Sequence, residues 1–369
     1  MDQLTKIDLH GFRSIQHLSQ FALTPLNVLI GPNGAGKSNF ISFFKFLNWM
    51  TSDPNLQFYI GKLGGANALL YDGASITPQV EATLTFQTGA GTNHYYFRLF
   101  HAAGDTLIFA EEKYRFSSNQ FSTAANWTNL GAGHRESKLI DASEQGNVTA
   151  RVIRSLLRQC VVHQFHNTSD TARIRQRWSV EDNRYLKEDG ANLAPFLLRL
   201  RETQPSAYLR VVETIRQITP FFADFVLNPV SGSVILQWSE TGTDVIFGAH
   251  QASDGTLRIM ALVALLLQPE PDLPAVVILD EPELGLHPFA IDVLAGLIRG
   301  IASHTQVILA TQSTTLINYF EPENVIVVDR PARASTLGRL ESGPLQEWLD
   351  EYSLAELWEK NVIGGRPSS

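Results

Sequence analysis

Two hydrophobic patterns recur along the chain and predict two kinds of strand. A predominantly apolar, strand-like run covers Leu26 to Ile30, a continuous apolar run occupies Ala275 to Leu279, and another predominantly apolar run covers Gln306 to Ala310. Such runs are typical of strands that are covered on both faces of a sheet. Alternating positions from Gln79 to Gln87 and from His94 to Phe100 instead predict hairpin strands separated by glycine-rich turns. The chain is therefore expected to be an α/β protein.

Helix-like periodicity fills other segments. It covers Phe40 to Met50, Ile259 to Leu267 and a longer region from about 186 to 222. The longer region lacks sustained heptads, so we expect a compact helical subdomain without extended arms. Residues 117–133 are rich in glycine, serine and asparagine and are expected to form a mobile loop.

The first apolar run leads into a phosphate-binding motif. Gly31 to Ser38 has the sequence G-P-N-G-A-G-K-S, whose glycines let successive backbone N–H groups point at phosphate oxygens. Lys37 can reach the β- and γ-phosphates, and the Ser38 hydroxyl can join the oxygen shell of Mg²⁺. We therefore expect the chain to bind ATP with Mg²⁺. The predicted nucleotide contacts are Asn33, Gly34, Gly36, Lys37 and Ser38.

The second apolar run ends in two carboxylates that are suited to hydrolysis. Asp280, the first polar residue after the run, can hold Mg²⁺ through water. Glu281 can lie beyond the strand and polarise the attacking water. The alternative is a solvated acidic turn after a core strand, which we would favour only without a phosphate-binding motif. The sequence thus predicts an ATPase.

Two further segments carry a resemblance to a known family. Ser253, Asp254 and Gly255 open an apolar helix, and on their own they indicate no more than a helix N-cap. However, the order of the phosphate motif, S-D-G-T-L-R, D-E-P-E-L-G-L-H-P and A-T-Q-S is similar to that of ATP-binding-cassette (ABC) ATPase heads of the RecF, SMC and OLD-like families. The resemblance spans nearly the whole chain.

This resemblance implies a domain organisation. We expect a two-lobed head with a mixed or parallel P-loop sheet, an antiparallel β subdomain and a short helical insert in place of a coiled coil. Residues 1–165 are assigned to lobe I, 166–230 to the insert and 231–369 to lobe II with a C-terminal helical tail.

The resemblance also implies a homodimer. In these families two heads enclose two ATP molecules, so Ser253, Asp254 and Gly255 of one copy are expected to contact the γ-phosphate bound by the other. The helix N-terminus would add its partial positive charge. Residues 283–288 resemble the family's loop that crosses the dimer seam, and the alternative is a plain strand-to-helix loop.

Three more residues receive roles by resemblance. Gln312 stands where the family usually carries a histidine, and its amide can donate to the γ-phosphate without carrying charge, which is consistent with slow or partner-dependent turnover. Gln164 is our candidate for the glutamine that senses Mg²⁺ and the γ-phosphate. The alternatives are a solvated strand end or a metal pair of His163 and His166. Arg13, within F-R-S, is expected to contact phosphate or adenine, with an exposed arginine as the alternative.

Composition narrows the class of protein. Of the 369 residues, 44% are hydrophobic and 18% are charged, which is enough for a large core. A single cysteine, no export signal and no long apolar run favour a cytoplasmic protein outside the membrane. The net charge of −8 argues against a uniformly basic surface, but one arginine cluster is either an acid-paired helix face or a DNA contact. Its members are Arg151, Arg154, Arg158, Arg173, Arg175, Arg177 and Arg184, with Trp178 among them.

The predicted hydrolysis is expected to drive a switch. Only about forty residues follow Arg330, too few for the nuclease domain that OLD-like proteins often carry, so we expect any nuclease to be a separate chain. Our leading hypothesis is an ATP-gated dimer in bacterial anti-phage defence or DNA surveillance that controls a separately encoded effector. The alternatives are a RecF-like DNA-repair clamp and an ATP-dependent scaffold with negligible turnover.

Overall fold

The structure, a computed structural model, describes residues 2–52, 55–119 and 126–365. Its centre is a sheet with the strand order β17-β16-β3-β15-β14-β8, in which all strands but the edge strand β17 are parallel to their neighbours. The strands are β3 (Leu26–Ile30), β8 (Cys160–His163), β14 (Val276–Asp280), β15 (Gln306–Ala310), β16 (Val325–Asp329) and β17 (Thr336–Arg339). The three predicted apolar runs are therefore neighbouring strands of one sheet.

A second sheet is antiparallel and has the order β2-β1-β4-β5-β6-β7. Its strands are β1 (Gln3–Phe12), β2 (Ile15–Ala22), β4 (Gln79–Thr88), β5 (Gly91–Ala102), β6 (Thr106–Ser118) and β7 (Thr128–Gly131). Buried and partly exposed residues alternate along β4 and β5, because only one face of this sheet is covered. The alternating pattern in the sequence predicted this arrangement.

One sequence-based expectation about this sheet is wrong. The two ends of the mobile loop predicted for residues 117–133 belong to strands, since β6 continues to Ser118 and Thr128–Gly131 pairs with β6 as β7. Backbone pairing with a long neighbour outweighs the weak strand propensity of these polar residues. The middle of the predicted loop, residues 120–125, lies outside the described residues.

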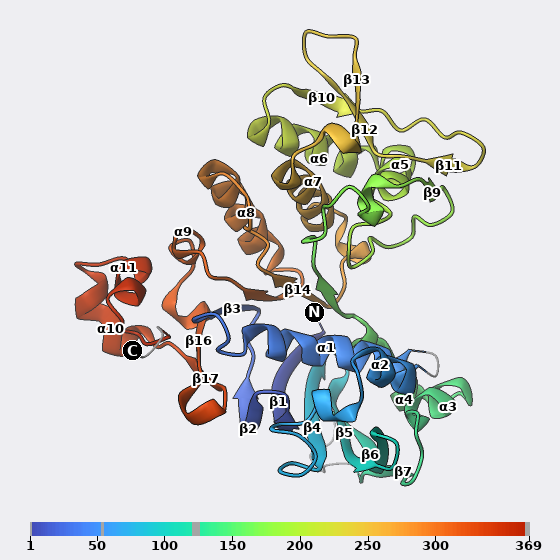
Figure 1. Cartoon of the computed structure of the whole chain (residues 1–369), viewed down its shortest axis with the longest axis vertical. Helices are drawn as coiled ribbons and strands as arrows, with labels where there is room; N and C mark the ends of the chain where they lie inside the picture. The colour runs from blue at the N-terminus through green and yellow to red at the C-terminus, as the bar shows by residue number, and fades with distance from the viewer. Residues whose placement is uncertain (1, 53–54, 120–125, 366–369) are drawn as a thin grey trace.

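Helices cover the sheets and extend the molecule beyond them (Figure 1). They are α1 (Lys37–Thr51), α2 (Leu56–Lys62), α3 (Lys138–Glu144), α4 (Val148–Arg158), α5 (Leu193–Thr203), α6 (Pro205–Ile218), α7 (Asp254–Leu266), α8 (Pro288–Ile301), α9 (Thr314–Ile317), α10 (Ser342–Leu349) and α11 (Leu354–Glu359). None of the helices in the described ranges is long and apolar enough to cross a bilayer.

The predicted helical insert is compact. Helices α5 and α6 contain 11 and 14 residues, and Figure 1 shows them at the opposite end of the molecule from the antiparallel sheet. Small strands accompany them, namely β9 (Trp178–Ser179) with β11 (Ser233–Val234), and β10 (Phe222–Phe225) with β12 (Gln237–Glu240) and β13 (Ile246–Gly248). Because β10 pairs with β12, residues on both sides of position 230 share one small sheet. The predicted domain boundaries stay a prediction.

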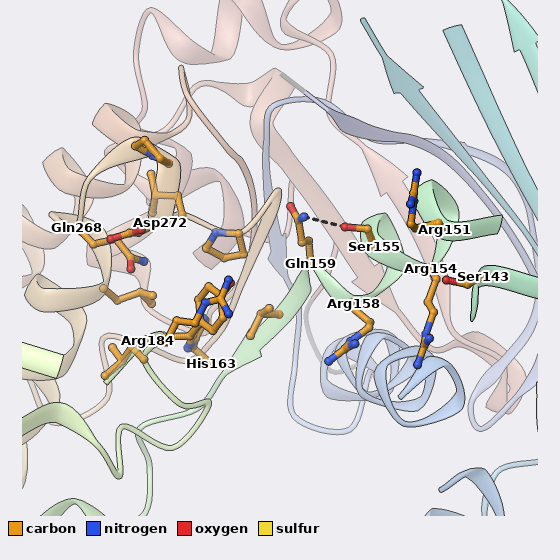
Figure 2. A pocket seen from close by; sticks show the side chains of 17 residues that line it. Ser143, Arg151, Arg154, Ser155, Arg158, Gln159, His163, Arg184, Gln268 and Asp272 are labelled. Carbon is orange, nitrogen blue, oxygen red and sulfur yellow. Dashed lines mark hydrogen bonds between the residues drawn. The ribbon is translucent and has the colours of Figure 1, made fainter. Parts of the chain in front are cut away.

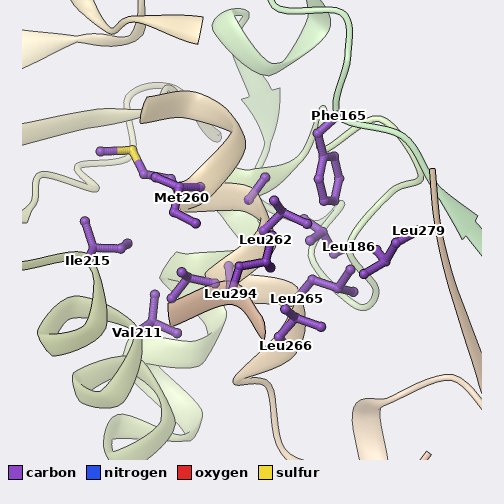
Figure 3. Packing of buried hydrophobic residues seen from close by; sticks show 14 of the residues in the cluster. Phe165, Leu186, Val211, Ile215, Met260, Leu262, Leu265, Leu266, Leu279 and Leu294 are labelled. Atoms are coloured by element: carbon purple, nitrogen blue, oxygen red, sulfur yellow. The ribbon is translucent and has the colours of Figure 1, made fainter. Parts of the chain in front are cut away.

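Two hydrophobic cores meet at the central sheet. Within β14, Val276 and Ile278 belong to the core shared with α1 and the antiparallel sheet, whereas Val277 and Leu279 belong to the core shared with α7 and α8. Figure 3 shows the second core, where apolar side chains of α7 such as Leu262 lie among those of neighbouring elements. Apolar side chains are therefore needed from Val276 to Leu279, which explains the continuous hydrophobic run before Asp280.

Candidate nucleotide-binding site

The parallel strands bring four loops together at one edge of the central sheet. Since β3, β15, β14 and β8 are parallel neighbours, the segments that follow them emerge side by side. These segments begin with Gly31, Thr311, Glu281 and Gln164. We call the ends of these strands and the loops that follow them the carboxyl edge. In α/β sheets this edge is where ligands bind.

The loop after β3 has the backbone of an anion cradle. Gly34 and Gly36 have φ angles of 80° and 115°, in the left-handed region that favours glycine. A Cβ at Gly36 would lie 2.1 Å from the Ser335 hydroxyl oxygen, so no larger residue fits there. Within the described chain, the N–H groups of Gly34, Gly36 and Lys37 have no protein acceptor. They are available to phosphate oxygens at the start of α1.

The Lys37 side chain is folded back onto this loop. Its ammonium group donates to two loop carbonyls, with the Gly31 oxygen at 2.5 Å, and the residue is 5% exposed. Burial lowers the pKa of Lys37, and the nearby carboxylates of Glu281, Asp280 and Glu283 oppose that shift. A phosphate oxygen would accept the same hydrogen bonds and supply the opposite charge next to this buried cation.

Gln164 contacts Asp280 directly. The Gln164 amide nitrogen donates to Asp280 Oδ2 at 2.6 Å, and its Oε1 accepts from the Lys45 ammonium group. His166 Nε2 donates to the Asp280 backbone carbonyl at 2.7 Å. Burial raises the pKa of Asp280, and its Oδ1 has no partner among the described residues. A buried carboxylate oxygen without a donor is suited to a hard cation, so these residues fit Mg²⁺.

Glu281 and Gln312 contact each other across the neighbouring strands β14 and β15. The Gln312 amide donates to Glu281 Oε1, and the Glu281 backbone has a left-handed φ of 44°. This conformation is uncommon for a residue other than glycine and turns the chain sharply after Asp280. The structure thus brings together the predicted base and the predicted switch residue, which are 31 positions apart in sequence.

A second buried carboxylate holds the segment that carries Gln312. Glu283 is 8% exposed, and its Oε1 accepts from the Thr311 hydroxyl at 2.5 Å and from the Gln312 N–H at 3.3 Å. Burial raises the pKa of Glu283. Sequence reasoning placed Glu283 only in the loop at the predicted dimer seam, yet its contacts are those of a residue that positions the end of β15.

The predicted signature residues lie at the start of α7, which we call the signature corner (residues 253–258). Ser253 is the N-cap and accepts from the Thr256 N–H at 3.1 Å, while Ser253 and Asp254 are exposed. A Cβ at Gly255 would lie 2.6 Å from the Gly285 carbonyl oxygen, so this close approach requires glycine. Among the described residues, no hydrogen bond or ion pair joins the corner to the phosphate loop of the same chain.

Arg175 supports the signature corner from behind. It is 4% exposed and donates to the carbonyls of Ala249 and Ala252 and, at 3.3 Å, to Asp254 Oδ1. Arg175 therefore cannot be a surface contact for DNA, as the sequence cluster had allowed. A guanidinium group can satisfy several acceptors at once, which explains why an arginine is buried here.

Arg258 joins the signature corner to two other loops. Its guanidinium group donates to the carbonyls of Phe165 at 3.2 Å, His166 at 3.1 Å and Leu284 at 2.5 Å. These carbonyls lie directly after Gln164 and within the predicted dimer-seam loop. A displacement of α7 would therefore disturb both the loop that follows Gln164 and the loop that follows Asp280.

Ser14, the neighbour of Arg13, makes the contacts that lead to the phosphate loop. Arg13 has a left-handed φ of 51°, and its Nε lacks a partner in the described part of the chain. Ser14, in contrast, accepts from the Asn39 amide at 2.7 Å, and its hydroxyl lies 2.7 Å from the Ser335 hydroxyl. The Ser335 hydroxyl donates to the carbonyl of Ala35 inside the phosphate loop, and it can accept from Ser14 at the same time. Ser14 and Ser335 therefore brace the cradle, and neither carries a motif that would have identified it.

Two other residues of the site had a signal that sequence reasoning missed. Lys45 is the one charged residue between Phe40 and Met50 of an otherwise apolar helix, and a cation in that setting indicates a partner nearby. Glu283 lies three residues after Asp280, where a third acid in the same motif indicates a further role. Arg175 and Arg258 had no comparable signal among many arginines.

The fold and this edge together define an ABC-type ATPase head. A family model described as "AAA domain, putative AbiEii toxin, Type IV TA system" matches residues 26–318, and the chain belongs to this family. Among curated proteins, no sequence match was found.

Solved structures agree with this fold. An Smc head bound to the C-winged helix domain of ScpA matches with a TM-score of 0.62 at 14% identity, covering 93% of this chain and 99% of that one. An Smc head with an extended coiled coil, bound to the C-terminal domain of ScpA and derived from Pyrococcus furiosus, matches with a TM-score of 0.57 at 14% identity, covering 95% of this chain and 99% of that one. The predicted two-lobed head is confirmed.

Proposed function

We propose that two copies of the chain close around ATP and hydrolyse it at two shared sites. Each site would combine the carboxyl edge of one copy with the signature corner of the other. The observation that supports this most strongly is that no bond joins the exposed signature residues to the phosphate loop within the described part of one chain. The edge has its polar groups arranged around Lys37 and Asp280, whereas Ser253 and Asp254 are exposed and make no bond to their own phosphate loop in the described residues.

Each residue of the proposed site has a defined task. Mg²⁺, when held by Ser38, Asp280 and Gln164, would neutralise charge on the β- and γ-phosphates. Lys37 exchanges its loop carbonyls for a phosphate oxygen. Glu281 accepts a proton from the attacking water as that oxygen bonds to the γ-phosphorus and the bond to the β–γ bridging oxygen breaks, which leaves ADP and phosphate.

We further infer that this cycle acts as a switch for a separately encoded effector, in bacterial anti-phage defence or DNA surveillance. The family description, which names a toxin and a type IV toxin–antitoxin system, supports a role of this kind. Co-purification of the chain with the products of neighbouring genes, with and without ATP, tests it. Failure of every neighbour to bind in either state would contradict the switch.

One contact favours a second candidate, an ATP-gated scaffold with negligible turnover. The Gln312 amide occupies Glu281 Oε1, the same carboxylate that must accept a proton from water. A base that already accepts a hydrogen bond is less available, so turnover is expected to be slow until the contact is released.

Replacement of the base separates the two candidates. Glu281→Gln keeps the size and the position of the side chain, so ATP binding should persist while turnover falls by about 10² to 10⁴. Glu347→Gln, an exposed residue of α10, is the matched control and should leave turnover unchanged. If Glu281→Gln hydrolysed ATP as fast as the wild type, Glu281 would not be the general base. Equal, negligible phosphate release by the wild-type chain and Glu281→Gln would identify the scaffold.

A further inference from the structure

A second cleft lies beside the edge strand β8 and contains none of the residues assigned to the nucleotide site. Its volume is about 650 Å³, and it lies between α4 and the segment that joins α7 to β14. Figure 2 shows the arginines of α4 on one side, and Arg184, Gln268 and His163 on the other. We call it the arginine cleft. Its size falls within the range of about 300 to 1,000 Å³ that is typical of small-ligand sites.

The cations of this cleft are poorly compensated. Arg151 and Arg158 are exposed, and their guanidinium groups form no ion pair or hydrogen bond within the ranges that the structure describes. Arg184 is also exposed, and its guanidinium group lies 5.1 Å from the centre of the Tyr185 ring. Asp272, the acidic residue in the described lining, is already paired with Arg199 at 3.0 Å. The lining therefore keeps an excess of positive charge, although the chain as a whole is acidic.

The arginine cluster found in the sequence is thus divided by the fold. Arg151, Arg154 and Arg158 follow one another at helical spacing on α4 and line the cleft together with Arg184. Arg154 is held by Glu144 at 3.2 Å. The other members of the cluster do not line the cleft, and Arg175 is internal.

Neutral groups complete the lining on the side of β8. His163 is 3% exposed, and neither of its ring nitrogens makes a hydrogen bond of ordinary geometry to a described residue. Burial lowers the pKa of His163 to about 4, with the Lys187 backbone opposing the shift, so the ring is neutral near pH 7 and has one donor and one acceptor. The Tyr185 ring is 60% exposed, which leaves an aromatic face for stacking. A ligand with both anionic and heteroaromatic parts matches this combination.

We propose that the arginine cleft binds the phosphate and base of a nucleotide unit, presented either by a nucleic-acid strand or by a free nucleotide. The forked guanidinium groups of Arg151, Arg158 and Arg184 match phosphate oxygens in geometry and charge. Tyr185 offers a stacking surface to the base, and such stacking is tolerant of sequence. This site is separate from the ATP site, and the proposal does not depend on hydrolysis there.

The position of the cleft provides a route to the ATP site. His163 ends β8, and the next residue, Gln164, donates to Asp280. Leu265 of α7 lines the cleft at the far end of the helix that begins at the signature corner. A ligand in the cleft therefore contacts both elements that lead to the carboxyl edge and the signature corner.

Two fluorescent probes test the proposal in the full-length chain with Lys37→Ala, so that the ATP site does not contribute. One probe is a single-stranded 20-nucleotide oligothymidylate and the other is AMP, and binding is followed by fluorescence anisotropy at several salt concentrations. Adding Arg158→Gln and Arg184→Gln should weaken binding of the active probe by about tenfold or more. For the oligonucleotide, the slope of log K against log salt should fall by about 0.7 for each arginine removed.

Arg210→Gln is the matched control, because Arg210 is exposed on α6 and does not line the cleft. It should leave binding unchanged. Binding of the oligonucleotide alone supports a nucleic-acid strand, and binding of AMP alone supports a free nucleotide. The proposal is overturned if neither probe binds, if polyglutamate binds instead of both probes, or if Arg210→Gln weakens binding as much as the cleft variants do. Arg158, Arg184 and Arg210 are all exposed, so the thermal unfolding temperature should be the same in every variant, and this measurement is the control for folding.

Discussion

The carboxyl edge and the signature corner present their polar groups in opposite ways. At the edge, Asp280, Glu283 and Thr311 are buried and are bonded to other residues of the same chain. At the corner, Ser253 and Asp254 are exposed, and the buried support lies behind them in Arg175. This difference teaches that the polar groups of the edge are held by contacts within the chain, whereas those of the corner face outward, as the proposed shared site requires.

The two regions are nevertheless connected. Arg258 belongs to the corner helix, and its guanidinium group donates to backbone carbonyls that follow Gln164 and Glu283. A partner that moves the corner would therefore disturb the contacts around Asp280. The comparison thus predicts that changes at the edge affect nucleotide binding and chemistry, while changes at the corner affect assembly and stability.

The largest effect is expected at the edge. Lys37→Ala removes the cation that faces the phosphates, so the affinity for ATP should fall by about a thousandfold, as isothermal titration calorimetry can measure. The control is Lys6→Ala, an exposed lysine on β1, which should bind ATP like the wild type. Unchanged affinity in Lys37→Ala would mean that the cradle does not hold the triphosphate.

The next effect is expected behind the corner. Arg175→Met removes the guanidinium donor of the Ala249 carbonyl and leaves the Ala252 carbonyl without a donor, so the free energy of unfolding in urea should fall by about 3 kcal/mol. Arg173→Met is the matched control, because Arg173 is exposed and pairs with Asp189 at the surface, and its effect should stay within about 0.5 kcal/mol. Similar losses in both variants would show that the burial of Arg175 does not stabilise the corner.

A smaller effect is expected at the end of β15. Thr311→Val removes the hydroxyl that donates to Glu283 and leaves a buried carboxylate with one donor fewer, which should cost about 1 kcal/mol of unfolding free energy. Turnover should also fall, since Thr311, the residue before Gln312, is no longer held by Glu283. Thr336→Val on the exposed strand β17 should change neither quantity. Full turnover and full stability in Thr311→Val would show that the hydrogen bond between Thr311 and Glu283 supports neither the fold nor the site.

The fold and the local motifs could be predicted because they depend on neighbouring residues. The runs at Leu26–Ile30 and Gln306–Ala310 are β3 and β15 to the residue, since a strand covered on both faces is mostly apolar. The phosphate loop is likewise a local arrangement of glycines before a helix. The roles assigned to its residues stay predictions.

The contacts that join distant segments could not be predicted. Glu283 and Thr311 are 28 positions apart, and Arg175 and Asp254 are 79 apart. Nothing local distinguishes Arg175, which is internal, from Arg173, which is exposed two residues earlier. Arg175 is held in the interior by contacts with Ala249, Ala252 and Asp254, which lie far away in the sequence. The prediction of a loop at 117–133 was wrong for the same reason, because β7 forms by pairing with β6.

The mass of the Glu281→Gln chain in solution with ATP and Mg²⁺ tests the central claim most directly. If a triphosphate is shared between two copies, light scattering should show 41.0 kDa without ATP and twice that mass with ATP. The double variant Glu281→Gln/Ser253→Arg should remain at 41.0 kDa while it still binds ATP. A chain that stays at 41.0 kDa when saturated with ATP, or a Ser253→Arg variant that doubles its mass equally well, would contradict the account.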